Sequence, residues 1–158
     1  MARKGKVTGG QNLNRILIAA KYGGVRNVTV GFFEGARYDD RSGTAVAKVA
    51  ARNEFGIGVP ERPFIRPANL KAVREIKRIL WESVDPQTMR VTQAIAGDVG
   101  NAMKTAYQKS IIELRSPPNA PATVARKRKR RTNSRFDAAN PLIDTTTMLN
   151  SVGYEVKY

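Results

Sequence analysis

The sequence contains no cysteine and no histidine, and these two absences exclude several kinds of chemistry. A chain without cysteine has no disulfide and no thiolate nucleophile, and a chain without histidine has no imidazole acid or base. The usual protein ligands for zinc and other transition metals are missing as well. We therefore expect a protein that is not an enzyme and that holds no cofactor and no metal ion.

Acidic residues are scarce, with 13 against 28 basic residues, which gives a net charge of +15. Such an excess is typical of proteins that meet a polyanion or an acidic protein surface. The excess is also concentrated in one segment. Residues 115–135 hold eight basic and no acidic residues, whereas residues 136–158 hold one lysine and three acidic residues.

Long hydrophobic runs are absent too. No stretch approaches the roughly 20 apolar residues that a membrane span needs, and residues 1–6 lack the apolar segment of a secretion signal. We expect a protein that works in an aqueous compartment and has no membrane partner.

The length and composition predict a single domain spanning residues 1–158, because 41% hydrophobic content suffices for one core. Residues 1–10 are interpreted as a mobile basic arm. Residues 116–141 contain four prolines and the run RKRKRR, and they are interpreted as a Pro-rich basic loop or a locally helical arm.

Hydrophobic periodicity predicts an α+β fold. Alternating apolar residues indicate strands at residues 28–32 and 152–158. Apolar residues at helical spacing indicate helices at residues 12–21, 44–55, 68–81 and 87–114. The expected class is a small, mostly antiparallel sheet packed against two or three helices, one of them long, with a long basic loop or arm.

Several residues fix the expected details of these helices. Thr44 and Asp144 are candidate N-caps, and Pro67 should delay the third predicted helix until about residue 68. Val73, Ile76, Ile79 and Leu80 should share one face of that helix. Gly97 and Gly100 weaken the longest helix, which suggests that another backbone approaches closely there or that the helix bends.

A carboxylate metal site is the most accessible enzymatic hypothesis. Asp39 and Asp40, together with Glu54 or Asp98, have the oxygen chemistry that suits magnesium. Their spacing is not specific, however, and the first two are flanked by arginines in a predicted loop. A solvated cluster of ion pairs is the preferred interpretation.

Nine basic residues are candidates for contact with DNA or with another subunit: Lys71, Arg74, Arg78, Arg126, Lys127, Arg128, Lys129, Arg130 and Arg131. The run from Arg126 to Arg131 suits phosphate contact with counterion release, docking on an acidic subunit, or a simply solvated surface. Phe136 is the single aromatic residue near it, so any DNA contact should be nonspecific.

Three segments occur in an order that resembles a known family. They are NEFGIGVPERPFIRPA at residues 53–68, PPNAPATVARK at residues 117–127 and NPLIDTTTMLNSVGYEV at residues 140–156. Over residues 28–158 the chain is similar to the tail-completion and virion-morphogenesis proteins of tailed bacteriophages. That group includes minor tail protein Z of phage lambda and protein G of phage Mu.

The family has a Glu-Phe-Gly segment and then a Pro-Arg-Pro-Phe element, which here correspond to Glu54, Phe55, Gly56, Arg62, Pro63, Phe64 and Arg66. Its Ala-Arg-Lys and Leu-Ile-Asp-Thr elements correspond to residues 125–127 and 142–145. The sequence departs from the family at Thr146, where glycine is usual, and at Met148, where a basic residue is common.

The resemblance implies a structural virion protein, a neck or tail-completion component that joins the tail to the head and lets DNA pass. It would be located at the top of the tail, after assembly in the host cytoplasm. It would form a homo-oligomeric ring of sixfold or twelvefold symmetry between the head-side connector and the tail tube or tail terminator protein, with nonspecific contact to packaged double-stranded DNA. The alternative is a free, nonspecific nucleic-acid-binding protein, for which the charge argues.

Overall fold

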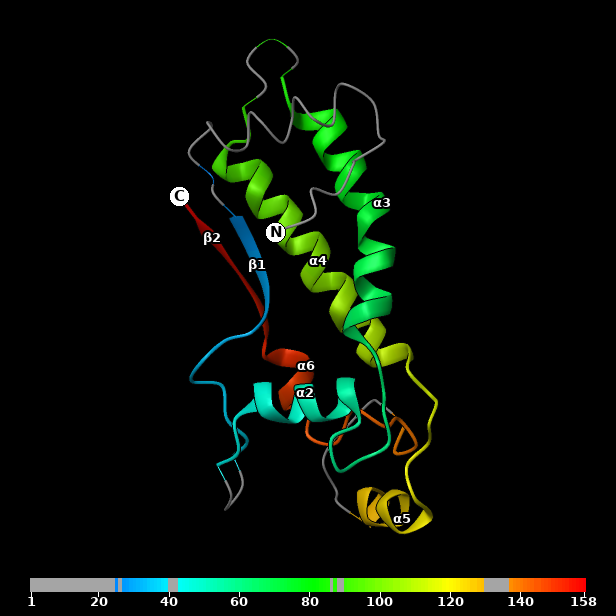
Figure 1. The fold of residues 1–158 in the computed structure, drawn as a ribbon. Helices are drawn as coiled ribbons and strands as arrows, with labels where there is room; N and C mark the ends of the chain where they lie inside the picture. Colours follow the sequence, from blue (N-terminus) through cyan, green and yellow to red (C-terminus); the bar gives the residue numbers. More distant parts are fainter. Residues whose placement is uncertain (1–24, 26, 40–42, 86, 88–89, 130–136) are drawn as a thin grey trace, which may run out of the picture.

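The computed structural model describes residues 25, 27–39, 43–85, 87, 90–129 and 137–158. In chain order the elements are β1 (Asn27–Phe32), α2 (Val46–Phe55), α3 (Ile65–Ser83), α4 (Gln93–Glu113), α5 (Pro121–Lys129), α6 (Thr147–Asn150) and β2 (Val152–Lys157) (Figure 1). The predicted arm at residues 1–10 and the predicted helix at residues 12–21 lie outside the described residues. No helix in the described ranges is long and apolar enough to cross a membrane.

The predicted α+β class is confirmed. β1 and β2 form a two-stranded antiparallel sheet in which Asn27 lies opposite Lys157 and Phe32 lies opposite Val152. The longest helix, α4, has 21 residues. The four other helices of the described residues surround it or lie at one end of it (Figure 1).

Helix α4 is the centre of the molecule, because it lies between the two-stranded sheet and α3 (Figure 1). Both strands pack on it from one side, and α3 packs antiparallel to it from the other. The buried residues of α3 are Ala68, Ala72 and Ile79, which share the helix face directed toward α4. Two of the three are alanines, whose small side chains let the helices approach closely.

The core consists of two hydrophobic clusters. One joins α2, the start of α3, the end of α4, α6 and β2 through Val46, Ala50, Phe64, Ala68, Tyr107, Ile111, Leu142, Ile143, Met148, Leu149 and Val152. The other lies between the far ends of α3 and α4 and contains Val25, Ile79, Val84, Val91, Ile95 and Ala96. The Phe32 ring packs edge-on against Phe64 of the first cluster, with 6.1 Å between centroids.

Two helices begin at different residues from those predicted. Helix α3 begins at Ile65, so Pro67 lies in its first turn, where the missing N–H is no loss because that position has no partner within the helix. Helix α4 begins at Gln93 instead of residue 87. Thr92 is its N-cap, and the Thr92 hydroxyl accepts a hydrogen bond from the Ile95 N–H at 3.3 Å.

The two predicted N-caps, Thr44 and Asp144, are wrong. The N-cap of α2 is Ala45, and the first N–H of that helix, from Val46, donates to the Ala36 carbonyl at 2.9 Å. The N-cap of α6 is Thr146, whose φ of 61° is in the left-handed region. A β-branched residue is strained there. The turn therefore has the backbone conformation that glycine would favour, although the sequence has threonine.

Gly100 is required by a close neighbour, as the sequence suggested, but the neighbour is a side-chain ring. A Cβ at position 100 would lie 2.3 Å from Cδ2 of Tyr154 on β2. At Gly97, one turn earlier, a Cβ would lie 3.8 Å from the Tyr154 hydroxyl oxygen, which is an ordinary contact. The Tyr154 ring thus fixes how closely the sheet packs on α4.

The two glycines give a matched test of this packing. Gly100→Ala should destabilise the fold by about 2 kcal/mol, because the added methyl group overlaps the Tyr154 ring. Gly97→Ala should stabilise it by about 0.5 kcal/mol, because alanine is the better helix former and has room. Urea denaturation monitored by circular dichroism measures both changes. Equal effects of the two substitutions would contradict the Tyr154 contact.

Candidate functional site

Glu54, at the end of α2, connects that helix to the start of α3. Its side chain is buried, and one carboxylate oxygen, Oε2, accepts hydrogen bonds from the N–H groups of Phe64 at 2.7 Å and Ile65 at 2.9 Å. The other oxygen, Oε1, accepts from the Arg66 N–H at 3.2 Å and the Arg66 Nε at 3.0 Å. A residue outside the helix therefore supplies the negative charge that helix N-termini favour.

The surroundings of Glu54 keep its carboxylate ionised. Burial by itself raises the pKa of Glu54, but hydrogen bonds from the Ile65 and Phe64 N–H groups and from Arg66 outweigh burial, so the pKa lies below its ordinary value of 4.5. Arg66 also forms an ion pair with Glu61 at the surface. Glu54 is therefore a structural cap for α3.

The carboxylates considered for a metal site do not form one in the described residues. Glu54 uses both oxygens within the protein, whereas Asp39 is exposed in a loop and Asp98 is exposed on α4. Asp40 lies outside the described residues. Among the residues that the structure describes, no three acidic side chains gather closely enough to hold a metal ion.

Arg62 connects the start of α3 to the segment that leads into α5. It is 7% exposed, and its guanidinium donates to the carbonyl oxygens of Pro117 and Pro118, each at 3.0 Å. Its backbone N–H donates to the Asn53 carbonyl at 2.6 Å. Charge-assisted bonds of this kind are among the stronger hydrogen bonds of proteins. Arg62 thus fixes the path of the chain between α4 and α5.

Asn140 caps the C-terminal end of α4 from outside that helix. The Asn140 side chain is buried, and its Nδ2 donates to the Ile112 carbonyl at 2.8 Å, one of the last carbonyls of α4. Its Oδ1 accepts from the N–H groups of Leu142 at 3.0 Å and Ile143 at 3.2 Å. The segment that follows α5 is therefore bound to α4 through one amide side chain.

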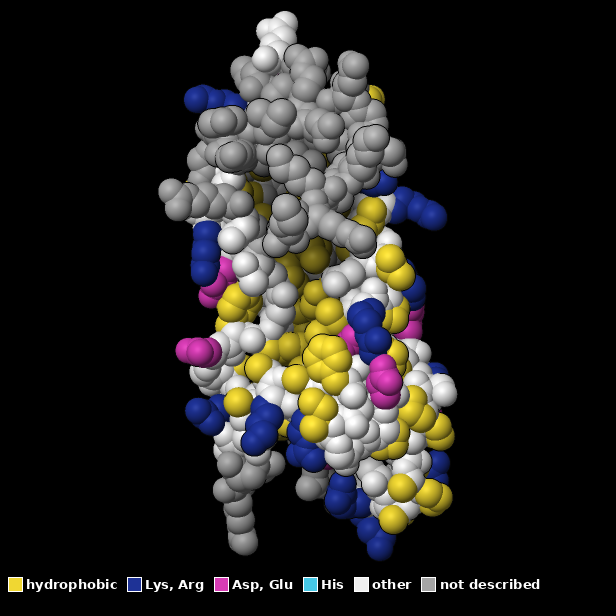
Figure 2. Space-filling view, viewed as in Figure 1, with side chains coloured by type: hydrophobic (Ala, Val, Ile, Leu, Met, Phe, Trp, Pro, Cys, Tyr) yellow, Lys and Arg dark blue, Asp and Glu magenta, His cyan; other side chains and the backbone are white. Residues whose placement is uncertain are grey.

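Residues 121–129 of the predicted basic loop are helical and form α5, which buries none of its residues. Arg126, Arg128 and Lys129 are exposed on it, at the end of the molecule where Lys and Arg side chains gather in Figure 2. Lys127 differs, because its ammonium donates to the carbonyl oxygens of residues 140 and 143 at 2.8 and 2.6 Å. Arg130, with Arg131, lies outside the described residues.

Burial lowers the pKa of Lys127, and the nearby positive charges of Arg62 and Arg126 lower it further, whereas Asp144 opposes them. Two of the three ammonium donors are already engaged within the chain. Lys127 is therefore mainly a structural residue that holds α5 to the segment after it. Of the predicted contact residues on α5, the structure leaves Arg126, Arg128 and Lys129 directed to solvent.

Three of the predicted contact residues, Lys71, Arg74 and Arg78, form a basic stripe on α3 that is partly neutralised. Lys71 forms an ion pair with Glu113 of α4 at 3.2 Å. Arg78 lies between two glutamates of its own helix, at 2.5 and 2.6 Å. Arg74 makes no ion pair with the described residues. Exposed pairs of this kind stabilise the fold little, but they reduce the positive charge that this helix presents.

The side of α3 that faces away from α4 carries large apolar side chains that the sequence analysis did not single out. Leu70 is 79% exposed and Trp81 is 70% exposed. They are eleven residues apart, about three helical turns, and so share a face. Val73 is 46% exposed, so it does not lie on the buried side of α3 with Ile79. We call Leu70, Val73 and Trp81 the outer face of α3.

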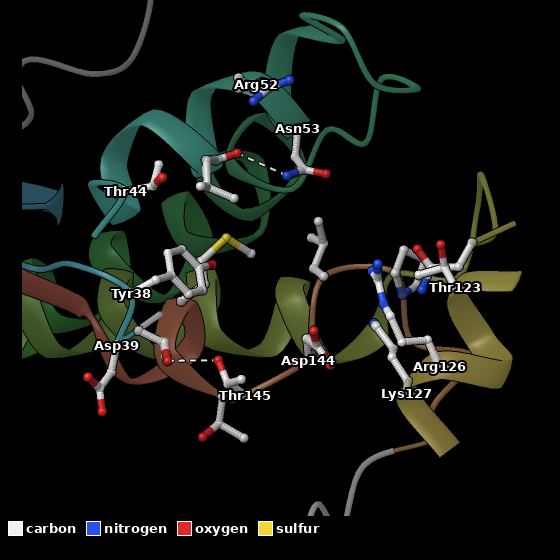
Figure 3. A pocket seen from close by; sticks show the side chains of 17 residues that line it. Tyr38, Asp39, Thr44, Arg52, Asn53, Thr123, Arg126, Lys127, Asp144 and Thr145 are labelled. Carbon is white, nitrogen blue, oxygen red and sulfur yellow. Dashed lines mark hydrogen bonds between the residues drawn. The ribbon is translucent and has the colours of Figure 1, made fainter. Parts of the chain in front are cut away.

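A cleft of about 790 Å³ lies between α2, α5 and the segment that leads into α6 (Figure 3). It brings together residues that are far apart in the sequence, including Arg52 of α2, Arg126 of α5 and Thr145. Of the predicted contact residues, Arg126 and Lys127 line it. The sequence offered no signal for the cleft, because its walls come from four separate segments.

Comparisons of the chain with protein-family models, with curated proteins and with solved structures found no match. The proposed function therefore rests on the residues and contacts of this chain.

The cap formed by Glu54 is open to a direct test. Glu54→Gln should lower the free energy of unfolding at neutral pH by about 3 kcal/mol, because it removes the buried charge that the Arg66 guanidinium and three N–H groups bind. Urea denaturation measures this loss. As a control, Glu61→Gln removes only an exposed partner of Arg66 and should cost under about 1 kcal/mol.

The pH dependence supplies a second readout. Because folding lowers the pKa of Glu54, its stabilisation is present above the ordinary pKa of 4.5 and is lost as the pH falls through the folded-state pKa. The difference in stability between the wild type and Glu54→Gln should therefore shrink below pH 4.5. A difference that stayed constant down to strongly acidic pH would contradict an ionised cap.

Proposed function

We propose that the protein is a structural component of a tailed-phage virion, a neck or tail-completion protein that forms a ring joining the tail to the head and lets DNA pass. The observation that carries the proposal is the outer face of α3. Leu70 and Trp81 are the two most exposed large apolar side chains among the described residues. Val73 lies one turn from Leu70, and Trp81 lies about two turns further along α3. Exposed apolar side chains of this size are typical of surfaces that pack against another protein.

The geometry of this face suits a repeated subunit contact. A ring needs a heterologous interface, in which one surface of each copy packs on a different surface of the next. Trp81 supplies a large anchor toward one end of the face and Leu70 with Val73 an apolar contact toward the other. The exposed Arg74 and Lys77 lie between them and supply polar contacts. The same helix is held rigidly from behind by α4, so forming the interface costs little conformational entropy.

The residues that carry the family resemblance also support the proposal. Glu54, Arg62 and Asn140 come from two of the three similar segments, and Arg62 binds carbonyls of the other. Together they connect α2, α3, α4 and the segment before α5. A shared architecture requires residues of this kind at these places, which is a physical reason for the three segments to occur together.

The exposed basic residues fit a role next to packaged DNA. Arg74 on α3 and Arg126, Arg128 and Lys129 on α5 have side chains that reach solvent. Weak phosphate contact would favour the presence of DNA without impeding its passage. Base-specific recognition needs side chains placed in a groove, and we assign none to this protein.

The experiment that tests the proposal is a symmetry-resolved electron cryomicroscopy reconstruction of the neck of the virion that carries this gene. We expect a ring of density at the junction of head and tail that the fold of Figure 1 fits, with α3 at the contact between copies. Absence of the protein from purified virions would overturn the proposal.

A pair of substitutions tests the outer face of α3 directly. Leu70→Asp combined with Trp81→Asp should abolish incorporation into virions, because it places two charges in the subunit contact, while the unfolding midpoint changes little. Ile57→Asp is the matched control, since Ile57 is 58% exposed but lies on the loop after α2. Incorporation is measured by mass spectrometry of purified particles. Normal incorporation of the α3 variant would show that this face is not the contact.

The exposed basic residues of α5 favour one alternative, a free nonspecific nucleic-acid-binding protein. In that case the isolated protein should bind duplex DNA tightly, with an affinity that falls steeply with salt concentration. Charge reversal at Arg126, Arg128 and Lys129 should then abolish the function, and substitutions on the outer face of α3 should leave it unchanged. Fluorescence anisotropy at several salt concentrations distinguishes the two.

A further inference from the structure

The cleft between α2 and α5 has two chemically different walls. Figure 3 shows Arg126, Lys127 and Thr123 on one side and Tyr38 and Asp39 on the other, with Arg52 above. All of these residues line the cleft. Arg126 and Lys127 therefore lie together on the α5 wall, and the opposite wall carries an aromatic ring and a carboxylate.

The floor and the rim of the cleft also differ in their chemistry. The floor includes the apolar residues Leu142 and Met148, which belong to the buried core. The rim carries the hydroxyl groups of Thr145 and Thr123, and Thr145 is exposed. A ligand in this cleft therefore meets apolar surface below it and hydrogen-bonding groups beside it, the usual combination in a binding pocket.

The positive charges of the cleft are only partly compensated. Arg126 makes no hydrogen bond or ion pair with the described residues, and Arg52 donates only to the Ile57 carbonyl, at 3.2 Å. Burial lowers the pKa of Lys127, and the nearby charges of Arg62 and Arg126 lower it further, whereas Asp144 opposes them. A carboxylate placed beside Arg126 and Lys127 would reduce the repulsion between these two cations.

We propose that this cleft binds an extended acidic peptide segment of a partner protein. A carboxylate of that segment would lie beside Arg126, and an aliphatic side chain would lie over the floor of the cleft, where Leu142 and Met148 are. Threonine hydroxyls on the rim would bond the peptide backbone. The site goes beyond a role in ring formation and does not depend on it, because the cleft and the outer face of α3 are formed by different residues.

Three features favour a peptide over DNA. The rim includes the carboxylates of Asp39 and Asp144, which repel a continuous chain of phosphates, whereas a peptide can place its carboxylate beside Arg126 and uncharged residues beside the two aspartates. The floor is apolar, and phosphates gain nothing from covering it. The volume of about 790 Å³ is that of a pocket for a short segment or small ligand. An extended peptide alone supplies both carboxylates and aliphatic side chains.

The test uses the full chain and a short fluorescein-labelled peptide composed of aspartate, leucine and serine, with a control peptide that has lysine in place of aspartate. Anisotropy titrations should show binding of the acidic peptide only. Arg126→Glu should weaken it about tenfold or more, equivalent to about 1.4 kcal/mol. Arg128→Glu changes the net charge equally on the same helix but lies outside the cleft lining, so it should weaken binding less than about twofold.

A second variant and a second probe complete the test. Thr123→Trp fills the cleft without changing the charge and should also reduce binding about tenfold. In methyl NMR spectra of the full chain, the acidic peptide should shift the Leu142 and Met148 signals, and inorganic phosphate should not. Equal weakening by Arg126→Glu and Arg128→Glu, equal shifts with phosphate, tighter binding of duplex DNA at the same signals, or no peptide binding at millimolar concentration would each overturn the proposal.

Discussion

The buried carboxylate of Glu54 is the interaction on which the rest of the structure depends. It neutralises the N-terminal end of α3 with hydrogen bonds to three successive N–H groups and ties that helix to α2. Because α3 begins there, Arg62 lies just before the helix and can reach the carbonyls that precede α5. Asn140 then returns the chain to the end of α4. One polar network thus links α2, α3 and α4, which the first hydrophobic cluster also packs together, to the segment before α5.

This network lies at one end of the molecule, and the long helices extend away from it. A two-stranded sheet is marginal by itself in water, so β1 and β2 depend on α4, where the Tyr154 ring covers Gly100. Helix α3 packs on the other side of α4 and nothing in the described residues packs against its far side (Figure 1). The exposure of Leu70 and Trp81 is a consequence of this layer order.

An element could be predicted from the sequence where local periodicity determines it. It could not be predicted where a residue far away in the sequence determines it. Alternation in residues 28–32 and 152–158 located both strands, because each has one face on α4. The start of α3 could not be predicted from Pro67. The residue that stabilises the first turn of α3 is Glu54, which lies 10 residues before Phe64 in the sequence. The same limit applied to the basic stripe, since Lys71 pairs with Glu113 of another helix. The cleft and the outer face of α3 likewise depend on how helices pack.

The position of the positive charge follows from the same architecture. Four consecutive cations repel one another, so a segment such as α5 is stable only where solvent or an anion surrounds it, and α5 accordingly buries no residue. It is held by Lys127 and by Arg62, both donating to carbonyl oxygens. These contacts place further positive charge beside Arg126. A bound carboxylate would offset that repulsion and so strengthen the attachment of α5, because a ligand that favours one arrangement stabilises it by its binding free energy. Binding of the proposed acidic peptide would therefore be coupled to the position of α5.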